Sequence, residues 1–129
     1  MNIVVLDGYA LNPGDLSWDG LKQLGQVTIY DRSSQDEVLE RVKDADIILT
    51  NKTPITEAVL DAAPNLKYVG VLATGYNIVD IEACRKRNIP VTNVPAYSTN
   101  AVAQLVFAYL LEIGHHVTHH TEAVMAGEW

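Results

Sequence analysis

The chain has 129 residues, of which 48% are hydrophobic and 19% are charged, a size and composition that indicate one globular domain and exclude intrinsic disorder. Sixteen acidic against nine basic residues give a formal net charge of −7, which argues against nucleic-acid or membrane binding because phosphate backbones and anionic headgroups repel such a surface. The single cysteine, Cys84, excludes an internal disulfide, and the N-terminus lacks a signal-peptide pattern. We therefore expect a cytoplasmic protein.

Five short apolar runs, each rich in β-branched or aliphatic residues, predict buried strands. They are residues 3–6, 27–30, 45–50, 68–72 and 89–93. Because helical patterns separate these runs, the sequence predicts an α/β fold with a parallel sheet covered by helices on both faces. The right-handed crossover rule favours a doubly wound, flavodoxin-like sheet with the strand order 2-1-3-4-5.

The helices between the strands are predicted from apolar spacing and from capping residues. A weak helical stripe covers 16–24, and a second helix follows Ser33 or Ser34. Thr56 begins a short helix that ends before Pro64, and Asp80 can cap a helix over 81–87 that contains Cys84 as a small core residue.

The last quarter of the chain predicts a long helix over 98–126, beginning at Ser98 or Thr99. Its segments 101–103 and 105–111 are apolar around nearly the whole circumference, so the helix has to be covered on all sides. At about 1.5 Å per residue it would be roughly 40 Å long, and a five-stranded sheet covers only one of its faces. We expect another domain or another copy to pack against it, and we interpret the ending at Trp129 as a truncation.

The glycines exclude a nucleotide cradle within this chain. The sequence contains no G-x-G-x-x-G and no G-x-x-x-x-G-K-[ST], the two patterns that place backbone N–H groups around a dinucleotide or a nucleoside triphosphate. The predicted sheet therefore does not itself carry a phosphate-binding loop of either kind.

In an open parallel sheet, ligands bind beyond the carboxyl ends of the strands, which here end in the loops 7–10, 51–53 and 73–77. In the last loop, Gly75 permits a turn that presents consecutive N–H groups to an anion, and Thr74 adds a hydroxyl, an arrangement that suits a small carboxylate. The alternative is a tight turn in which Gly75 has a positive φ. Lys52 would attract the same anion, or is an ordinary solvated lysine.

Four histidines near the C-terminus have metal-compatible spacing. His115 and His119, like His116 and His120, are i,i+4 pairs if the helix is continuous. No supporting carboxylate motif accompanies them, so we interpret them as exposed polar helix surface and predict no metal site.

Three segments together resemble the N-terminal part of the D-isomer-specific 2-hydroxyacid dehydrogenases, above all their glycerate dehydrogenase and hydroxypyruvate reductase branch. They are Thr-Gly-Tyr-Asn-Ile-Val-Asp at 74–80, Asn-Ile-Pro-Val-Thr-Asn-Val-Pro at 88–95, and the segment 98–105. The resemblance extends over essentially the whole chain, with one departure at Gln104, where many members have Glu.

This resemblance implies a flavodoxin-like substrate domain at 1–97, followed at 98–129 by an interdomain helix and arm leading to a Rossmann domain beyond the chain. That second domain would bind NAD or NADP and carry the catalytic Arg, Glu and His, so no catalytic residue is expected here and the chain alone should be inactive. The implied partners are a small 2-hydroxy or 2-oxo acid of the glycerate, hydroxypyruvate or glyoxylate type, the Rossmann domain, and a second copy in a homodimer.

The resemblance also implies which residues border the substrate: Asn51, Lys52, Ala73, Thr74 and Gly75. The backbone at Thr74 and Gly75 would bind the substrate carboxylate. Thr74 would also approach the cofactor, and Val102 would line the nicotinamide pocket.

Two other classes share the predicted topology. One is a stand-alone flavodoxin-like module that binds a small anion or a partner and dimerises through its long helix. The other, a phospho-acceptor receiver domain, needs an aspartate at the end of the third strand, where Asn51 and Lys52 stand, and is set aside.

Overall fold

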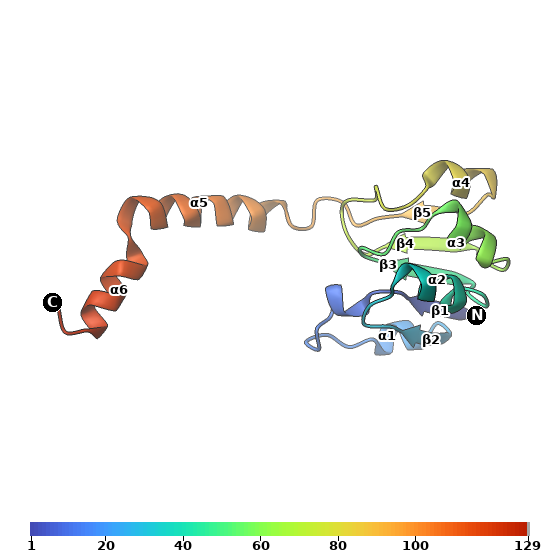
Figure 1. The fold of residues 1–129 in the computed structure, drawn as a ribbon, viewed down its shortest axis with the longest axis horizontal. Coiled ribbons are helices and arrows are strands. Elements are labelled where there is room, and N and C mark those ends of the chain that lie inside the picture. The colour runs from blue at the N-terminus through green and yellow to red at the C-terminus, as the bar shows by residue number, and fades with distance from the viewer. Residues whose placement is uncertain (129) are drawn as a thin grey trace. The chain divides into compact units, whose positions relative to one another are not determined.

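The computed structural model, which describes residues 1–128, divides the chain into two compact units, Met1–Pro95 and Ala96–Trp129. The first unit contains an all-parallel five-stranded sheet with the order β2-β1-β3-β4-β5 (Figure 1). Its strands are β1 (Asn2–Val5), β2 (Gln26–Ile29), β3 (Ile47–Thr50), β4 (Tyr68–Val71) and β5 (Val91–Thr92). The predicted α/β class and strand order are confirmed.

The connections contain a 3-10 turn and four short helices: η1 (Gly8–Ala10), α1 (Asp19–Lys22), α2 (Gln35–Arg41), α3 (Glu57–Ala62) and α4 (Ile81–Lys86). The predicted caps of α3 and α4 are confirmed, since Thr56 Oγ1 accepts from Val59 N at 3.4 Å and Asp80 Oδ1 accepts from Ala83 N at 2.8 Å. Of the two candidate serines, Ser34 precedes α2, and the Glu37 carboxylate accepts its N–H at 2.9 Å.

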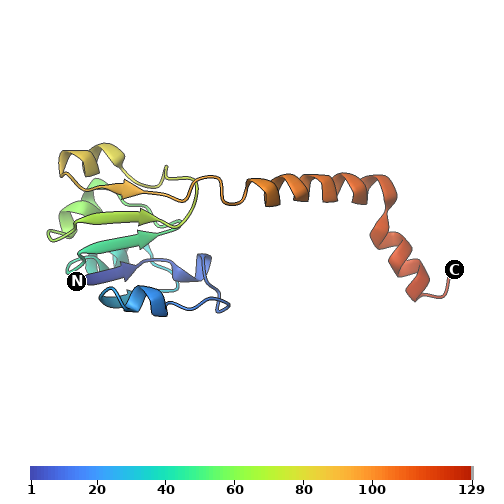
Figure 2. The same ribbon diagram turned by 180° about the vertical axis from the view of Figure 1, so that it is seen from behind.

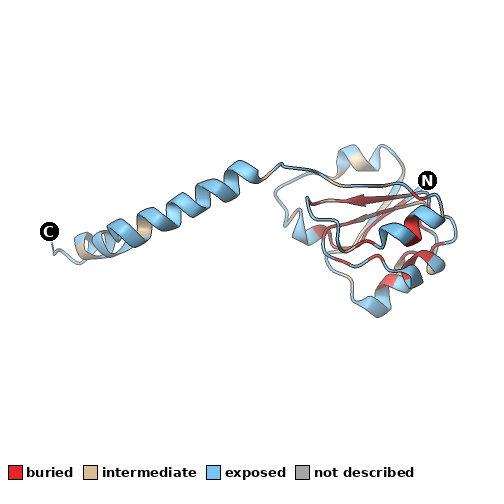
Figure 3. Ribbon diagram, turned by 90° about the horizontal axis from the view of Figure 1, so that it is seen from above, coloured by how far each residue is buried: buried red, intermediate tan, exposed pale blue. Residues whose placement is uncertain are grey.

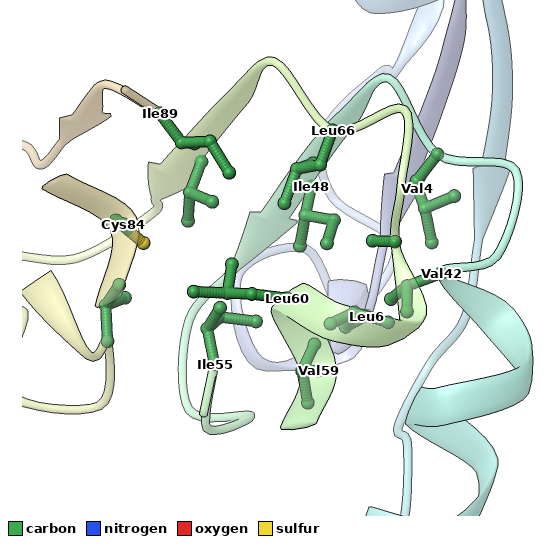
Figure 4. Close-up of a cluster of buried hydrophobic side chains, with 14 of the residues drawn as sticks. Val4, Leu6, Val42, Ile48, Ile55, Val59, Leu60, Leu66, Cys84 and Ile89 are labelled. Carbon is green, nitrogen blue, oxygen red and sulfur yellow. The ribbon is translucent and has the colours of Figure 1, made fainter. Parts of the chain in front are cut away.

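The hydrophobic core lies between the sheet and α2, α3 and α4 (Figure 4). Side chains at alternate positions of a strand point to the same face, which brings Val4, Ile48 and Val69 onto these helices. Cys84 of α4 is buried in the same cluster, as predicted, and desolvation by this apolar environment raises the pKa of its thiol.

The opposite face of the sheet is covered less completely. There α1, four residues long, lies over β2 (Figure 2). Side chains of β3 and β4 that face away from the main core, those of Ile47, Leu49 and Tyr68, remain partly exposed. In the first unit, α1 is too short to reach across β3 and β4 on this face.

The second unit consists of two exposed helices, α5 (Thr99–His115) and α6 (Val117–Met125) (Figure 3). The predicted continuous helix over 98–126 is wrong at His116, whose left-handed conformation, with φ 48°, ends α5. The Glu112 side chain accepts the N–H of Thr118 at 3.3 Å across this break, which stabilises the start of α6. No helix in residues 1–128 is long and apolar enough to cross a bilayer. The ending at Trp129 lies outside the described residues.

Asp46 ties together the amino ends of three strands. Its Oδ2 accepts the N–H of Asn2 at 2.8 Å and its Oδ1 accepts from Lys67 Nζ at 2.7 Å. The Lys67 hydrogen bond, followed by the bond from Asn2, lowers the pKa of Asp46 below its ordinary value of 3.8. This carboxylate therefore stabilises the fold in its ionised form.

The first prediction concerns the core. Ile48→Ala removes a side chain that is 0% exposed, and the cavity and lost burial should lower the free energy of unfolding by about 2–5 kcal/mol. Urea denaturation followed by circular dichroism measures the change. Leu24→Ala, at a side chain that is 63% exposed, is the control and should change stability by less than about 0.5 kcal/mol. Equal losses in the two variants would contradict the assigned core.

The second prediction concerns acid stability. Because folding lowers the pKa of Asp46, the ionised side chain stabilises the native state above its unfolded pKa, and this contribution is lost as the pH falls through its folded pKa. Asp46→Asn should therefore be less stable than the wild type near neutral pH, and the two curves of stability against pH should converge below about 3.8. Asp44→Asn, at an exposed carboxylate that forms no ion pair within residues 1–128, is the control. If the free energy of unfolding of Asp46→Asn stays below that of the wild type by the same amount down to acidic pH, the ion pair of Asp46 does not stabilise the fold.

Candidate functional site

The carboxyl ends of the strands define the candidate site. The strand order 2-1-3-4-5 reverses direction between β1 and β3, so the loops after these two strands diverge to opposite sides and leave a crevice. The loop after β4 is adjacent, since Thr50 pairs with Val71 and Leu72 N donates to Thr50 O at 2.7 Å. The structure thus brings the loop containing Asn51 and Lys52 next to the loop containing Ala73, Thr74 and Gly75.

A buried carboxylate closes the crevice between β1 and β3. Asp7 follows β1, is 5% exposed, and accepts the N–H of Asn51 on Oδ1 at 2.8 Å. Its Oδ2 accepts the N–H of Lys52 at 2.5 Å and the N–H of Thr53 at 2.8 Å. The Thr53 hydroxyl also donates to Oδ2, at 3.1 Å. Three consecutive backbone donors therefore surround one internal anion.

This arrangement changes what the loop after β3 can offer to a ligand. The N–H groups of Asn51 and Lys52 are engaged by Asp7, so only the side chains of these residues remain available. Asn51 is 9% exposed, whereas the Lys52 side chain is exposed and forms no ion pair within residues 1–128. Sequence reasoning missed the role of Asp7; an aspartate directly after a buried strand at the switch point was the available signal.

The loop after β4 is held from one side and open on the other. Asn93 Nδ2 donates to Thr74 O at 2.7 Å, and the Thr74 hydroxyl donates to Val94 O at 3.0 Å. Val94 N donates to Ala73 O at 3.1 Å. Thr74 and Gly75 are exposed, and among the described residues no acceptor takes their N–H groups. A loop that three hydrogen bonds hold in place and that carries two free, adjacent backbone donors is suited to bind a carboxylate.

Gly75 does not adopt the positive φ that the tight-turn alternative requires. Positive values occur at two other described glycines, Gly14 and Gly127, so that expectation is wrong. A Cβ atom placed on Gly75 would meet only Asn77 Oδ1, at 3.5 Å, an ordinary contact. The fold itself therefore tolerates a side chain at Gly75, and its absence leaves free space beside the open donors.

The remaining candidates lie elsewhere. Val102 is an exposed residue in the first turns of α5, in the second unit. His115 belongs to α5 and His119 to α6, so they do not form an i,i+4 pair on one helix as the continuous helix had predicted. Within residues 1–128, no group of three or more His, Cys, Asp or Glu side chains is arranged to hold a metal ion.

A dinucleotide does not fit the described residues by themselves. Gly8 follows β1, where a dinucleotide fold has its glycine-rich turn, but a Cβ there would lie 2.7 Å from Ile29 Cγ2. Gly8 is therefore needed for packing against β2 rather than for the approach of a pyrophosphate. The N–H groups at the neighbouring strand end are already bound to Asp7.

The sequence and fold are similar to those of known proteins. The family model described as "D-isomer specific 2-hydroxyacid dehydrogenase, catalytic domain" matches residues 3–128. A hydroxypyruvate reductase from Blautia hydrogenotrophica is 54% identical over 132 residues, covering 100% of this chain and 41% of the reductase. A glyoxylate reductase from Pyrococcus furiosus is 40% identical over 96 residues, covering 74% of this chain and 29% of that protein.

Among solved structures, an acyclic imino acid reductase in complex with NADPH and D-Arg superposes with a TM-score of 0.78 at 27% identity. The match covers 98% of this chain and 41% of that chain. The chain therefore spans less than half the length of the relatives it matches.

The third prediction tests whether the hydrogen bonds that Asp7 accepts hold the loop after β3 in place. Asp7→Ala leaves the N–H groups of Asn51, Lys52 and Thr53 without their acceptor, which should lower the free energy of unfolding by about 2–4 kcal/mol. Hydrogen exchange should accelerate at these three amides more than at Leu72, which donates to Thr50. Asp15→Ala, in an exposed loop, is the control. Unchanged exchange at the three amides would show that Asp7 does not hold the loop.

Proposed function

Because the chain belongs to the D-isomer-specific 2-hydroxyacid dehydrogenase family, we propose that it forms the substrate-binding part of an NAD(P)-dependent oxidoreductase. The enzyme interconverts a D-2-hydroxy acid and the corresponding 2-oxo acid, of the glycerate/hydroxypyruvate or glyoxylate type. The similarity to a hydroxypyruvate reductase and to a glyoxylate reductase supports this substrate class.

The observation that carries the proposal is the pair of free backbone donors at Thr74 and Gly75. In our proposal these N–H groups bind the substrate carboxylate, with Ala73 forming the buried base of the loop. Asn93 and Val94 hold the loop in place before the substrate arrives, so little ordering cost is incurred on binding. Lys52, and beside it Asn51, border the same substrate, and the unpaired Lys52 ammonium attracts the anion.

The cofactor belongs in this proposal to a part of the enzyme outside the described residues, since those residues do not fit a dinucleotide by themselves. The NADPH complex of the similar imino acid reductase supports the use of a nicotinamide dinucleotide, NAD or NADP. Thr74 and Val102 are proposed to border this cofactor. The catalytic Arg, Glu and His are likewise proposed to lie outside residues 1–128.

The second unit supports a role in assembly. Many large apolar side chains of α5 are exposed, among them Leu105, Phe107 and Leu110. Covering such a surface with protein is strongly favourable, so we assign 98–129 to an interdomain helix and arm, following a substrate domain at 1–97, that packs against the Rossmann domain and against a second copy in a homodimer. We place the enzyme in the cytoplasm, where the Cys84 thiol stays reduced.

The test of function compares two chains. A chain that continues into the Rossmann domain should oxidise NADH or NADPH in the presence of hydroxypyruvate or glyoxylate, monitored by the loss of nicotinamide absorbance. The 129-residue chain should show no turnover. Activity of the short chain would contradict its assignment as a substrate domain, and inactivity of the long chain on every 2-oxo acid would contradict the enzyme assignment.

The fourth prediction tests, within the longer enzyme, whether the loop after β4 that contains Thr74 and Gly75 binds the substrate carboxylate. Gly75→Val fills the space beside the free donors, so the KM for the 2-oxo acid should rise about 10-fold or more, a loss of about 1.4 kcal/mol in binding. Stability should change little, because the fold leaves that space open. Gly20→Ala, where an added Cβ meets nothing within 4 Å, is the control. An unchanged KM in a folded Gly75→Val enzyme would show that the substrate carboxylate does not bind at this loop.

A further inference from the structure

A groove of about 590 Å³ lies between α4 and β5. Its walls come from α4, from the continuous segment 88–93 that contains β5, and from Tyr76. The three residues of the proposed carboxylate loop, Ala73, Thr74 and Gly75, do not line it. The groove therefore offers a surface that the proposed function does not use.

One wall of the groove is an open sheet edge. In the described sheet, β5 has β4 as its one neighbour (Figure 1). On that inner side, Pro90 O accepts from Val69 N at 3.1 Å. Successive residues of a strand direct their backbone groups to opposite sides, so the N–H and C=O of Val91 point away from β4, toward the open edge.

Nothing in the strand itself protects this edge. A proline often blocks an edge strand, but the backbone of Pro90 is directed to the side of β4, so its missing N–H leaves the outer side unchanged. The side chain of Val91 packs against the main core, and Ile89 beside it is 9% exposed. Ile81 and Tyr76, which also line the groove, are exposed. Unpaired backbone groups thus lie next to an apolar wall.

The groove also contains a cation. Arg85 lines it, is exposed, and forms no ion pair within residues 1–128. The described residues that line the groove include no aspartate or glutamate, although the whole chain has a net charge of −7. Lys86, the next residue of α4, is unpaired in the same way but does not line the groove.

The cation and the open edge are held in place relative to each other. Arg87 Nη2 donates to Asp61 Oδ1 at 2.5 Å, which ties the end of α4 to α3. Asn88 N donates to Arg85 O at 3.1 Å, and Ile89 N donates to Cys84 O at 3.0 Å, so the turn from α4 into β5 is fixed by hydrogen bonds. A ligand therefore meets a preformed surface and incurs little ordering cost in the protein.

We infer that this groove binds an extended peptide segment, which adds to the sheet as a further strand beside β5. Only a ligand with a backbone of its own satisfies the open N–H and C=O of Val91, and a carboxylate of that ligand pairs with Arg85. Side chains at alternate positions of a strand share a face, so the segment carries an acidic and an apolar side chain two residues apart, the apolar one against Ile81 and Ile89.

The fifth prediction uses a peptide of this pattern, acetyl-Thr-Ile-Thr-Glu-Thr-Ile-Thr-amide, and the 129-residue chain. The peptide should shift the NMR amide signals of Val91 and Asn93. Exchanging its third and fourth residues moves Glu to the face opposite Ile without changing the composition, and should weaken binding about 10-fold, the loss expected for one charge-assisted hydrogen bond. Equal binding of the two peptides would contradict the alternating pattern.

Two protein variants test the role of the cation. Arg85→Gln should weaken binding of the first peptide about 10-fold. Lys86→Gln is the matched control, because it removes the same charge from the neighbouring position outside the groove, and it should bind as the wild type does. Circular dichroism establishes that each variant is folded. Equal binding by the two variants would show that Arg85 does not contact the peptide.

The added strand is tested through the backbone of both partners. Val91→Pro removes the outward N–H and should abolish the amide shifts. Two peptides that are N-methylated at alternate residues, one for each set, test the same bonds without changing the protein, and one of the two should lose binding. The inference is overturned if both methylated peptides bind like the parent, or if 4-methylpentanoate, an apolar acid without a peptide backbone, binds as tightly. No measurement here requires turnover, so its result is independent of the enzyme assignment.

Discussion

The hydrogen bonds of Asp7 are the constraint on which the functional edge of this structure depends. A doubly wound sheet leaves a crevice where its strand order reverses, and the backbone donors around that crevice need an acceptor. Here the chain supplies its own, because one buried carboxylate accepts three consecutive N–H groups from the neighbouring loop. The position usually open to a ligand is thereby closed, and Lys52 is held beside it with its side chain free.

Because Asp7 binds the N–H groups of residues 51–53, the groups at this sheet edge that stay available to a ligand lie beside the crevice. Free, adjacent backbone donors remain in the next loop, at Thr74 and Gly75, and hydrogen bonds with Asn93 and Val94 hold this loop in place. Arg32 and Lys52 line an adjacent cavity and form no ion pair within residues 1–128. A pair of adjacent backbone N–H groups suits a single small carboxylate.

Much of the fold follows from local chemistry that can be read along the chain. Runs such as 3–6 and 68–72 are apolar enough to be buried strands, and Thr56 and Asp80 cap the helices that follow them. The site was harder to predict in detail. Pairing of distant loops decides which N–H groups are free, and neither the engagement of Asn51 by Asp7 nor the ordinary φ of Gly75 has a local sequence pattern. The break at His116 was missed because apolar spacing continues across it.

The sequence by itself determined the α/β class, the apolar character of α5 and the family, because each depends on residue type and spacing along the chain. The strand order followed from the right-handed crossover rule once the alternation of strands and helices was known. Only the tertiary structure decided which strand-end groups are available to a ligand. Asp7 lies 44 residues from Asn51, and Arg32 and Lys52 come from different loops. Whether a donor is satisfied or a charge is unpaired depends on what the fold places next to it, and those neighbours are distant in sequence.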